Sequence, residues 1–208
     1  MGRLRLGVLI SGSGRTLRNF IELAAADRIP ARVAVVISSS SRAGGLEFAR
    51  RAGIPTQVID YDATPPEQCD ERIALVLRAA DVDLVCMAGF LKLWRIPPDF
   101  AGRVMNIHPA LLPAFGGLGF YGDRVHRAVL AAGGAESGCT VHFADNEYDH
   151  GPIILQRRVP VRPDDTPESL ADRVFAQELL AYPEAIRLYA AGRLKIEGRA
   201  VAVLPSDK

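Results

Sequence analysis

An asparagine and a histidine stand two residues apart near the middle of the chain, in the stretch from Val104 to Phe115. The stretch begins with apolar residues typical of a buried strand, and Pro109 and Pro113 exclude regular structure after it. Because side chains two residues apart on a strand point to the same side, Asn106 and His108 should emerge together at its carboxyl end. That end of an open α/β sheet is where ligands bind.

An amide and an imidazole in this position suit a reaction at a carbonyl group. The Asn106 amide can hydrogen-bond a carbonyl oxygen that becomes an oxyanion, and a protonated His108 can stabilise that oxygen or donate a proton to it. The alternative is that both residues satisfy carbonyl groups of a neighbouring loop. The pair by itself leaves these two interpretations open.

A second polar segment connects two predicted strands, residues 137–143 and 153–161. This connection, residues 144–152, is dense in carboxylates, and its Asp149 precedes the sequence His-Gly-Pro. A solvated acidic loop is one interpretation of the segment. A carboxylate that faces a catalytic group is the other.

Histidine and aspartate are also metal-ligand types, so a metal site has to be considered for His108, His142, Asp149 and His150. The close spacings typical of zinc sites are absent from this set. We therefore expect no metal. His142 lies within a predicted strand, and we expect it to be a packed core residue.

A glycine-rich turn follows the first predicted strand. An apolar run over residues 4–11 leads into Gly-Ser-Gly and then into a helical pattern over residues 16–26, which is typical of the start of a βαβ unit. The backbone amides of such a turn and the N-terminus of the helix suit an anion. The turn lacks the third glycine of the dinucleotide fingerprint and the Gly-Lys-Ser/Thr of a P-loop. A turn that only uses glycine for its shape is therefore the alternative.

Strands and helices alternate along the remaining chain, which predicts the α/β class. Thr166 and Pro167 should begin the last long helix as N-cap and first residue, and Tyr182-Pro183 should interrupt or kink it. Further strands are expected over residues 31–38, 56–59 and 83–87, further helices over 44–53, 67–80 and around Val125-His126, and a terminal hairpin over 195–203.

Composition excludes several classes of protein. The 208 residues carry a formal net charge of +1 and no basic cluster, which argues against a nucleic-acid partner. No apolar run approaches the roughly 20 residues that span a bilayer, and we expect no signal peptide. The three cysteines form no Cys-x-x-Cys pair and predict reduced thiols of a cytoplasmic protein. Without repeats or linkers, we expect a single domain over residues 1–208.

The segment Asn-Ile-His-Pro-Ala-Leu-Leu-Pro, which begins at Asn106, closely resembles the Asn-x-His-x-Ser-x-Leu-Pro motif of the 10-formyltetrahydrofolate-dependent formyltransferases and related hydrolases. Val-His-Phe followed by Asp149-x-Gly-Pro resembles the other diagnostic segment of this family. The resemblance extends over the whole chain. It implies a Rossmann-like α/β fold with an open, mostly parallel sheet and helices on both faces.

The resemblance also implies a reaction, the transfer of the formyl group of 10-formyltetrahydrofolate to the amine of glycinamide ribonucleotide (GAR) in de novo purine biosynthesis. The amine attacks directly, Asn106 and His108 stabilise the oxyanion, and no metal takes part. A nearby carboxylate favours a charged histidine, so Asp149 is expected to raise the pKa of His108 and to relay the amine's proton through water. The only partners implied are these small molecules, bound by a monomer or a homodimer.

Further site residues are implied by the resemblance alone. In the family the glycine turn holds the phosphate of GAR, which assigns Gly14, Arg15 and Thr16 to that group, with Thr16 as helix cap and Arg15 either on the phosphate or in solvent. Glu178 stands where the family carries a glutamate that binds the ribose hydroxyls.

The segment after Ala-Gly-Phe lines the folate pocket in the family, although an ordinary connection with core aromatic residues would look similar. Ala110 stands where the family usually has serine, and Pro66 where some members have an arginine near the folate tail. The residues implied for folate binding are Leu91, Lys92, Leu93, Trp94 and Asn106.

Three other functions were weighed against this reaction. A 10-formyltetrahydrofolate hydrolase would use Asn106, His108 and Asp149 with water in place of the amine, but usually has an additional N-terminal domain. A methionyl-tRNA formyltransferase is disfavoured by the absence of a further C-terminal domain and of a basic surface. A non-catalytic nucleotide-binding module would not need all three polar residues.

Overall fold

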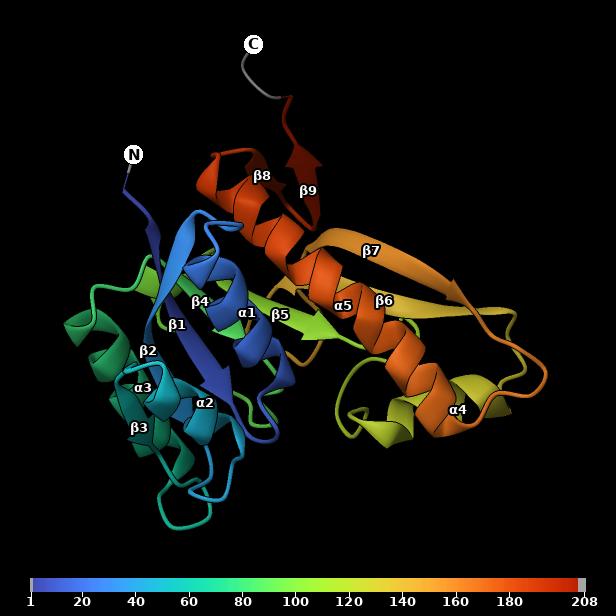
Figure 1. The fold of residues 1–208 in the computed structure, drawn as a ribbon, viewed down its shortest axis with the longest axis horizontal. Coiled ribbons are helices and arrows are strands. Elements are labelled where there is room, and N and C mark those ends of the chain that lie inside the picture. Colours follow the sequence, from blue (N-terminus) through green and yellow to red (C-terminus); the bar gives the residue numbers. More distant parts are fainter. Residues whose placement is uncertain (1, 206–208) are drawn as a thin grey trace. The chain divides into compact units, whose positions relative to one another are not determined.

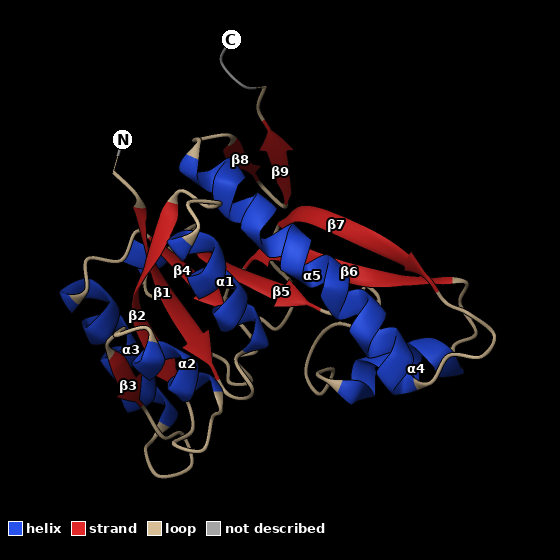
Figure 2. Cartoon of the chain, in the orientation of Figure 1, coloured by secondary structure: helices blue, strands red, loops and turns tan. Residues whose placement is uncertain are grey.

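The computed structural model describes residues 2–205, and the chain divides into two compact units, residues 1–105 and 106–208. Strands and helices alternate along the sequence (Figure 1), and Figure 2 separates the two kinds of element by colour. The predicted strands and helices are confirmed, with ends displaced by two residues at most. The prediction of one domain concerns how the two units associate, and it stays a prediction.

The first unit is a parallel sheet with helical connections. Its strands follow the order β3-β2-β1-β4, and the pairs β1–β2, β1–β4 and β2–β3 are all parallel. β5 (Val104–His108) spans the boundary between the units. The other elements are β1 (Leu4–Ile10), α1 (Arg15–Ala25), β2 (Ala31–Ser38), α2 (Gly45–Arg51), β3 (Thr56–Val58), α3 (Pro66–Ala79), β4 (Leu84–Met87) and the short 3-10 helix η1 (Pro98–Phe100).

Helices cover both faces of this sheet. The evidence is the packing of α2 and α3 against two residues of β1. A Cβ added to Gly7 would collide with Leu77 of α3, whereas a Cβ on Gly45 of α2 would lie 2.7 Å from Ile10. Gly7 and Ile10 are three residues apart on one strand and therefore point to opposite faces. α2 and α3 thus lie on opposite faces, which confirms the predicted arrangement.

The second unit combines antiparallel and parallel pairing. β6 pairs antiparallel with β7, β7 parallel with β9, and β9 antiparallel with β8, and α5 packs against β6 and β7. Most of the strand pairs described in the chain are parallel, so the α/β class is confirmed. The elements are α4 (Asp123–Ala131), β6 (Glu136–Phe143), β7 (Ile153–Pro160), α5 (Pro167–Ala190), β8 (Leu194–Glu197) and β9 (Ala200–Val203).

The last long helix begins as predicted and is continuous to Ala190. The Thr166 hydroxyl accepts from the Ser169 amide, and the Ser169 hydroxyl accepts from the Thr166 amide, which is a reciprocal capping box with Pro167 at the first helical position. Of the two alternatives predicted at Tyr182-Pro183, the interruption is wrong, since α5 runs through both residues, and the kink stays a prediction. Both are buried, and their packing offsets the hydrogen bond that proline removes.

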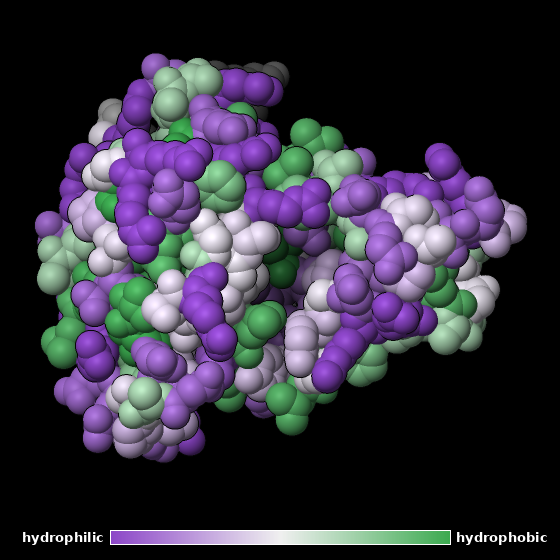
Figure 3. All heavy atoms as spheres, turned by 60° about the horizontal axis from the view of Figure 1, so that its bottom comes forward, coloured by the Kyte–Doolittle hydropathy of each residue, from purple (hydrophilic) through white to green (hydrophobic). Residues whose placement is uncertain are grey.

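The surface of the described residues is mixed. Hydrophilic and hydrophobic residues are interspersed on the face shown in Figure 3. None of the helices within residues 2–205 has the length and apolar character needed to cross a membrane.

Candidate active site

Two segments of the second unit carry the predicted catalytic side chains. β5 ends with Asn106 and His108, and the connection between β6 and β7 carries Asp149 in the left-handed region, with φ of 54°. A Cβ on Gly151 would collide with the carbonyl of Phe143 at the end of β6, so only glycine allows the connection to fold back here. This turn brings Asp149 to the other two residues.

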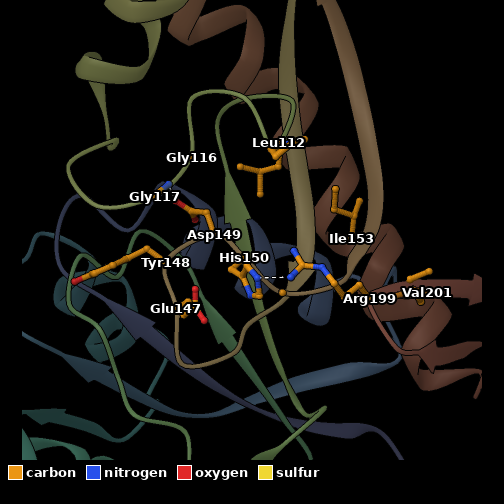
Figure 4. Close-up of a pocket in the computed structure, with 13 residues that line it drawn as sticks. Leu112, Gly116, Gly117, Glu147, Tyr148, Asp149, His150, Ile153, Arg199 and Val201 are labelled. Atoms are coloured by element: carbon orange, nitrogen blue, oxygen red, sulfur yellow. Dashed lines mark hydrogen bonds between the residues drawn. The ribbon is translucent and has the colours of Figure 1, made fainter.

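The Asp149 carboxylate is the centre of the cluster. Its Oδ2 lies 3.3 Å from Nδ1 of His108 and accepts a hydrogen bond of 3.0 Å from the amide of Gly117. Its Oδ1 accepts from the Asn106 side-chain amide at 3.2 Å. Asp149 points toward Gly117 in Figure 4. The structure therefore brings the three predicted catalytic residues together, as their motifs implied.

Each ring nitrogen of His108 faces an oxygen atom that can only accept a hydrogen bond. Nε2 lies 2.7 Å from the carbonyl oxygen of Phe115, and Nδ1 faces Asp149. A neutral imidazole has a single N–H and satisfies one of these acceptors, whereas the imidazolium satisfies both. With 4% of the His108 side chain exposed, water cannot serve the second nitrogen freely. The geometry therefore offers an acceptor to an N–H group on either ring nitrogen of His108.

Asp149 is held as a carboxylate. Burial alone raises the pKa of the Asp149 carboxyl, but hydrogen bonding to His108, the positive charge of His108 and the Gly117 amide together hold that pKa well below its ordinary value. The site therefore contains an ionised carboxylate that is 8% exposed. Such a charge suits the task of stabilising a cationic neighbour.

His142 of β6 belongs to the cluster, which the sequence reasoning missed. It is buried, as expected of a core residue, but its Nε2 lies 3.2 Å from Nδ2 of Asn106 and 3.7 Å from Oδ1 of Asp149. Its Nδ1 donates to the carbonyl of Phe143 at 2.9 Å, so the neutral ring can accept from the Asn106 amide and orient it. The alternation of Thr140 and His142 in the sequence indicates a polar side of this strand, but it does not show that this side faces Asn106.

The loop after His108 is held by two side chains from the adjacent strands. The Thr140 hydroxyl donates to the carbonyl of Ala110 at 2.7 Å and accepts from the amide of Leu112 at 3.0 Å. Gln156 donates to the carbonyl of Leu112 and to the Thr140 hydroxyl, both at 2.9 Å. Although Ala110 replaces the usual serine, the backbone at this position is therefore fixed.

His150 points away from this cluster. Its Nδ1 donates to Asp145 at 2.8 Å and its Nε2 contacts Arg199, at the wall of a cavity of about 550 Å³ (Figure 4). No group of three or more histidine, cysteine, aspartate or glutamate residues within positions 2–205 is arranged to hold a metal ion. The cavity is lined by Leu112, Pro113, Gly116, Gly117, residues 147–151, Ile153 and residues 199–201.

The residues assigned to the GAR phosphate lie in the first unit. Gly14, with φ of 72°, is the N-cap of α1, and a Cβ there would collide with Gly45, so the turn is pressed against the start of α2. The predicted capping role of Thr16 is wrong, because the helix begins at Arg15 and has no side-chain cap. Thr16 is buried, and Arg15 is exposed at the first helical position.

Glu178, assigned to the ribose, lies on α5 of the second unit. It is 9% exposed and therefore is not the solvated glutamate that a helix usually presents. Burial and the charge of Glu178 raise the pKa of the Cys139 thiol to about 12, which places the two side chains in the same environment. Cys139 is accordingly a protonated, unreactive thiol.

The residues assigned to folate differ in how much surface they offer. Leu91 is 49% exposed, Lys92 lies 3.1 Å from Asp62, and Leu93 is half-buried. Trp94 is fully buried and donates from Nε1 to the carbonyl of Asp70 at 3.2 Å. Its side chain belongs to the core, so its place in the predicted folate set depends on its backbone. Asn106, the fifth residue of the set, lies in the second unit.

Comparisons with known proteins agree with the motifs. The formyl transferase family model matches residues 4–186. The chain is 37% identical over 196 residues to the phosphoribosylglycinamide formyltransferase of Haemophilus influenzae, covering 93% of this chain and 90% of that protein. The crystal structure of glycinamide ribonucleotide transformylase 1 from Symbiobacterium toebii has a TM-score of 0.90 and 49% identity, covering 98% of this chain and 95% of that one.

Some relatives are longer than this chain. It is 39% identical over 210 residues to the trifunctional purine biosynthetic protein adenosine-3 of Drosophila pseudoobscura, with 99% of this chain aligned, yet spans only 15% of that protein. It spans 62% of the chloroplastic phosphoribosylglycinamide formyltransferase of Vigna unguiculata. The similarity therefore concerns one part of such proteins.

Proposed function

We propose that this chain, which belongs to the formyl transferase family, transfers the formyl group of 10-formyltetrahydrofolate to the amine of GAR, a step of purine biosynthesis. One support is the names of two relatives that are covered over at least 90% of their own length, a phosphoribosylglycinamide formyltransferase and a glycinamide ribonucleotide transformylase. The other is the cluster of Asn106, His108 and Asp149. The reaction is a one-carbon group transfer without a covalent enzyme intermediate.

The observation that carries the proposal is the electrostatic state of the cluster. An ionised Asp149 faces Nδ1 of His108, the carbonyl of Phe115 faces Nε2 of the same ring, and the Asn106 amide adds a neutral donor beside them. A cation and an amide donor are the groups that stabilise a developing oxyanion. The buried surroundings strengthen these interactions relative to water.

The first chemical step is attack of the GAR amine on the formyl carbon, which breaks the C=O π bond and places a negative charge on the oxygen. His108 and Asn106 donate to that oxygen. The hydrogen bond from His108 to Phe115 then has to open in favour of the oxyanion. Phe115 has a φ of 55° and precedes Gly116-Gly117, where the backbone can turn with little cost.

The second step expels the folate nitrogen. The ammonium formed by attack loses a proton to Asp149, directly or through a water. The same proton is passed on to the folate nitrogen as its bond to the formyl carbon breaks and the oxyanion collapses to the formyl C=O group, so that Asp149 returns to the carboxylate. Because His108 and Gly117 favour the charged form of Asp149, the carboxyl group holds this proton only transiently and gives it up readily. The products are formyl-GAR and tetrahydrofolate, and protons balance.

Substrate binding follows the assignments made from the motifs. The backbone amides around Gly14, with Arg15 and Thr16, receive the GAR phosphate, and Glu178 binds its ribose. The exposed Leu91, its neighbours Lys92 and Leu93, and the backbone of Trp94 form the folate contact in the first unit. No step requires a metal.

Absorbance of 10-formyl-dideazafolate with and without GAR tests the proposal directly. We expect deformylation only when GAR is present, with formyl-GAR formed in equal amount by mass spectrometry. Equal rates with and without GAR would show hydrolysis instead, because water would then replace the amine at the same residues.

A further inference from the structure

Ser11, the residue that follows β1, makes two hydrogen bonds to the segment after β4. Its backbone amide donates to the carbonyl of Gly89 at 3.0 Å, and its hydroxyl accepts from the amide of Leu91 at 2.9 Å. One residue of the glycine turn therefore fixes the backbone of residues 89–91 at two points.

The Ser11 hydroxyl is also held from a third side. Its Oγ lies 2.7 Å from Oγ of Ser39, which is 6% exposed and whose amide donates to the carbonyl of Ile10 at 3.1 Å. Because Ser11 accepts from Leu91, its own proton can be donated to Ser39. The hydroxyl thus has an acceptor and a donor role filled within the protein.

The glycine turn itself is held by other contacts. The amide of Gly45 donates to the carbonyl of Gly12 at 3.1 Å, and Gly14 is packed directly against Gly45. These contacts involve backbone atoms, and none of them uses the Ser11 hydroxyl. The shape of the turn and the position of residues 89–91 are therefore supported by different groups.

We propose that Ser11 is a positioning residue for the folate-binding segment, although by sequence it belongs to the turn assigned to the GAR phosphate. This inference depends on the proposed function. Its hydroxyl is engaged with Leu91 and Ser39, and removing it leaves the Leu91 amide without its acceptor. Leu91 is the most exposed member of the predicted folate segment, so its backbone sets where that side chain meets the ligand.

Steady-state kinetics of Ser11→Ala provide the first test. Loss of one hydrogen bond should raise KM for 10-formyltetrahydrofolate by about 5–10-fold while KM for GAR stays within about twofold. Ser11→Thr keeps the hydroxyl and should restore the folate KM. Ser39→Ala keeps the Ser11–Leu91 bond and should change it by less than about twofold. A rise in KM for GAR alone would overturn the proposal and assign Ser11 to the phosphate.

A matched control comes from the same turn. Ser13 is exposed, and Ser13→Ala should leave the folate KM unchanged, whatever it does to KM for GAR. An equal rise in the folate KM for both alanine variants would also overturn the proposal, since it would show a general loosening of the turn.

Amide hydrogen exchange of the ligand-free protein separates this inference from the proposed function. By NMR, the Leu91 amide should exchange at least about tenfold faster in Ser11→Ala than in the wild type or in Ser11→Thr. An unchanged rate would overturn the positioning role. If the wild type transferred no formyl group, the proposed function would fail, while the Leu91 exchange would still decide whether Ser11 holds the segment.

Discussion

The two units fix their candidate site segments by different means. In the first, neutral groups do so, since backbone amides, carbonyls and the hydroxyl of Ser11 hold residues 89–91 and the glycine turn. In the second, a buried carboxylate, Asp149, holds His108 and Asn106. A neutral hydrogen bond contributes about 0.5–1.5 kcal/mol, whereas removal of one partner of a buried charge leaves the other uncompensated. Changes to the glycine turn and residues 89–91 should therefore alter substrate binding, and changes to Asp149 and its two partners should alter the chemical step.

The largest expected effect follows from Asp149→Asn. Asparagine also tolerates the left-handed φ of 54°, so the fold should be kept, but the charge opposite His108 is lost. We expect kcat to fall by about 10³-fold, as for removal of an acid–base group, with an unchanged circular dichroism spectrum. Asp145→Asn, a change to the same connection outside the cluster, is the matched control and should keep kcat within about twofold.

This variant also has a signature in stability. A carboxyl whose folded pKa lies below its ordinary value of 3.8 stabilises the protein above that pH, and the contribution is lost as pH falls through the lowered pKa. Wild-type stability should therefore drop below about pH 4 more steeply than that of Asp149→Asn. Parallel acid-unfolding curves would contradict the charged state assigned to Asp149.

Asn106→Ala tests the neutral donor of the same cluster. Loss of one oxyanion donor should lower kcat by about 10²-fold, while KM for GAR changes little. A smaller loss of kcat in Asn106→Ala than in Asp149→Asn would distinguish a hydrogen-bond donor from the residue that supplies the buried charge. A rate within threefold of wild type would remove Asn106 from oxyanion stabilisation.

Arg15→Ala addresses the first unit, where binding should respond instead of chemistry. If the exposed Arg15 contacts the GAR phosphate, KM for GAR should rise by about 5–10-fold with kcat and the folate KM unchanged. Arg18→Ala, on the next turn of α1 and paired with Glu22, is the control and should change neither KM. Unchanged constants in both variants would mean that the backbone amides and Thr16 bind the phosphate unaided.

The smallest effect is expected from a buried histidine of the second unit that does not join the cluster. Burial lowers the pKa of His126 below its ordinary value of 6.5. The charge of His108 lowers this pKa further, whereas the charge of Asp123 raises it. A lowered histidine pKa gives stability that is present above about pH 6.5 and is lost as pH falls. His126→Phe removes this titration, and the drop in Tm between pH 7 and pH 5 should shrink by about 2–4 °C. An equal drop in Tm in the wild type and the variant would show that His126 binds a proton equally well in the folded and the unfolded protein.

Much of the fold could be predicted because its signals are local. Alternating apolar runs and turn residues indicated the strands and helices, and the N-cap at Thr166 was correct. The continuity of α5 through Pro183 could not be predicted, since it depends on burial supplied by distant residues. The cap of α1 was misassigned to Thr16 because a glycine in the left-handed region satisfies the same position without a side chain.

The grouping of Asn106, His108 and Asp149 could be predicted from the motifs, but the surroundings of the three residues could not. His142 has the composition of a core residue and is buried like one, so nothing in its local pattern shows that it faces Asn106. The clamp formed by Thr140 and Gln156 on Leu112 joins residues 28 and 44 positions apart in sequence. Such contacts depend on tertiary packing, which a single sequence does not specify.

The N–H groups of Asn106 and His108 already have partners within the protein: Asp149, His142 and the Phe115 carbonyl. A ligand that hydrogen-bonds to them must displace one partner for each bond it forms, so the exchange contributes little net affinity. Inhibitors designed around these two side chains alone would therefore gain selectivity for the charge distribution of the transition state, but little potency. Their affinity would have to come from contacts with residues outside this cluster.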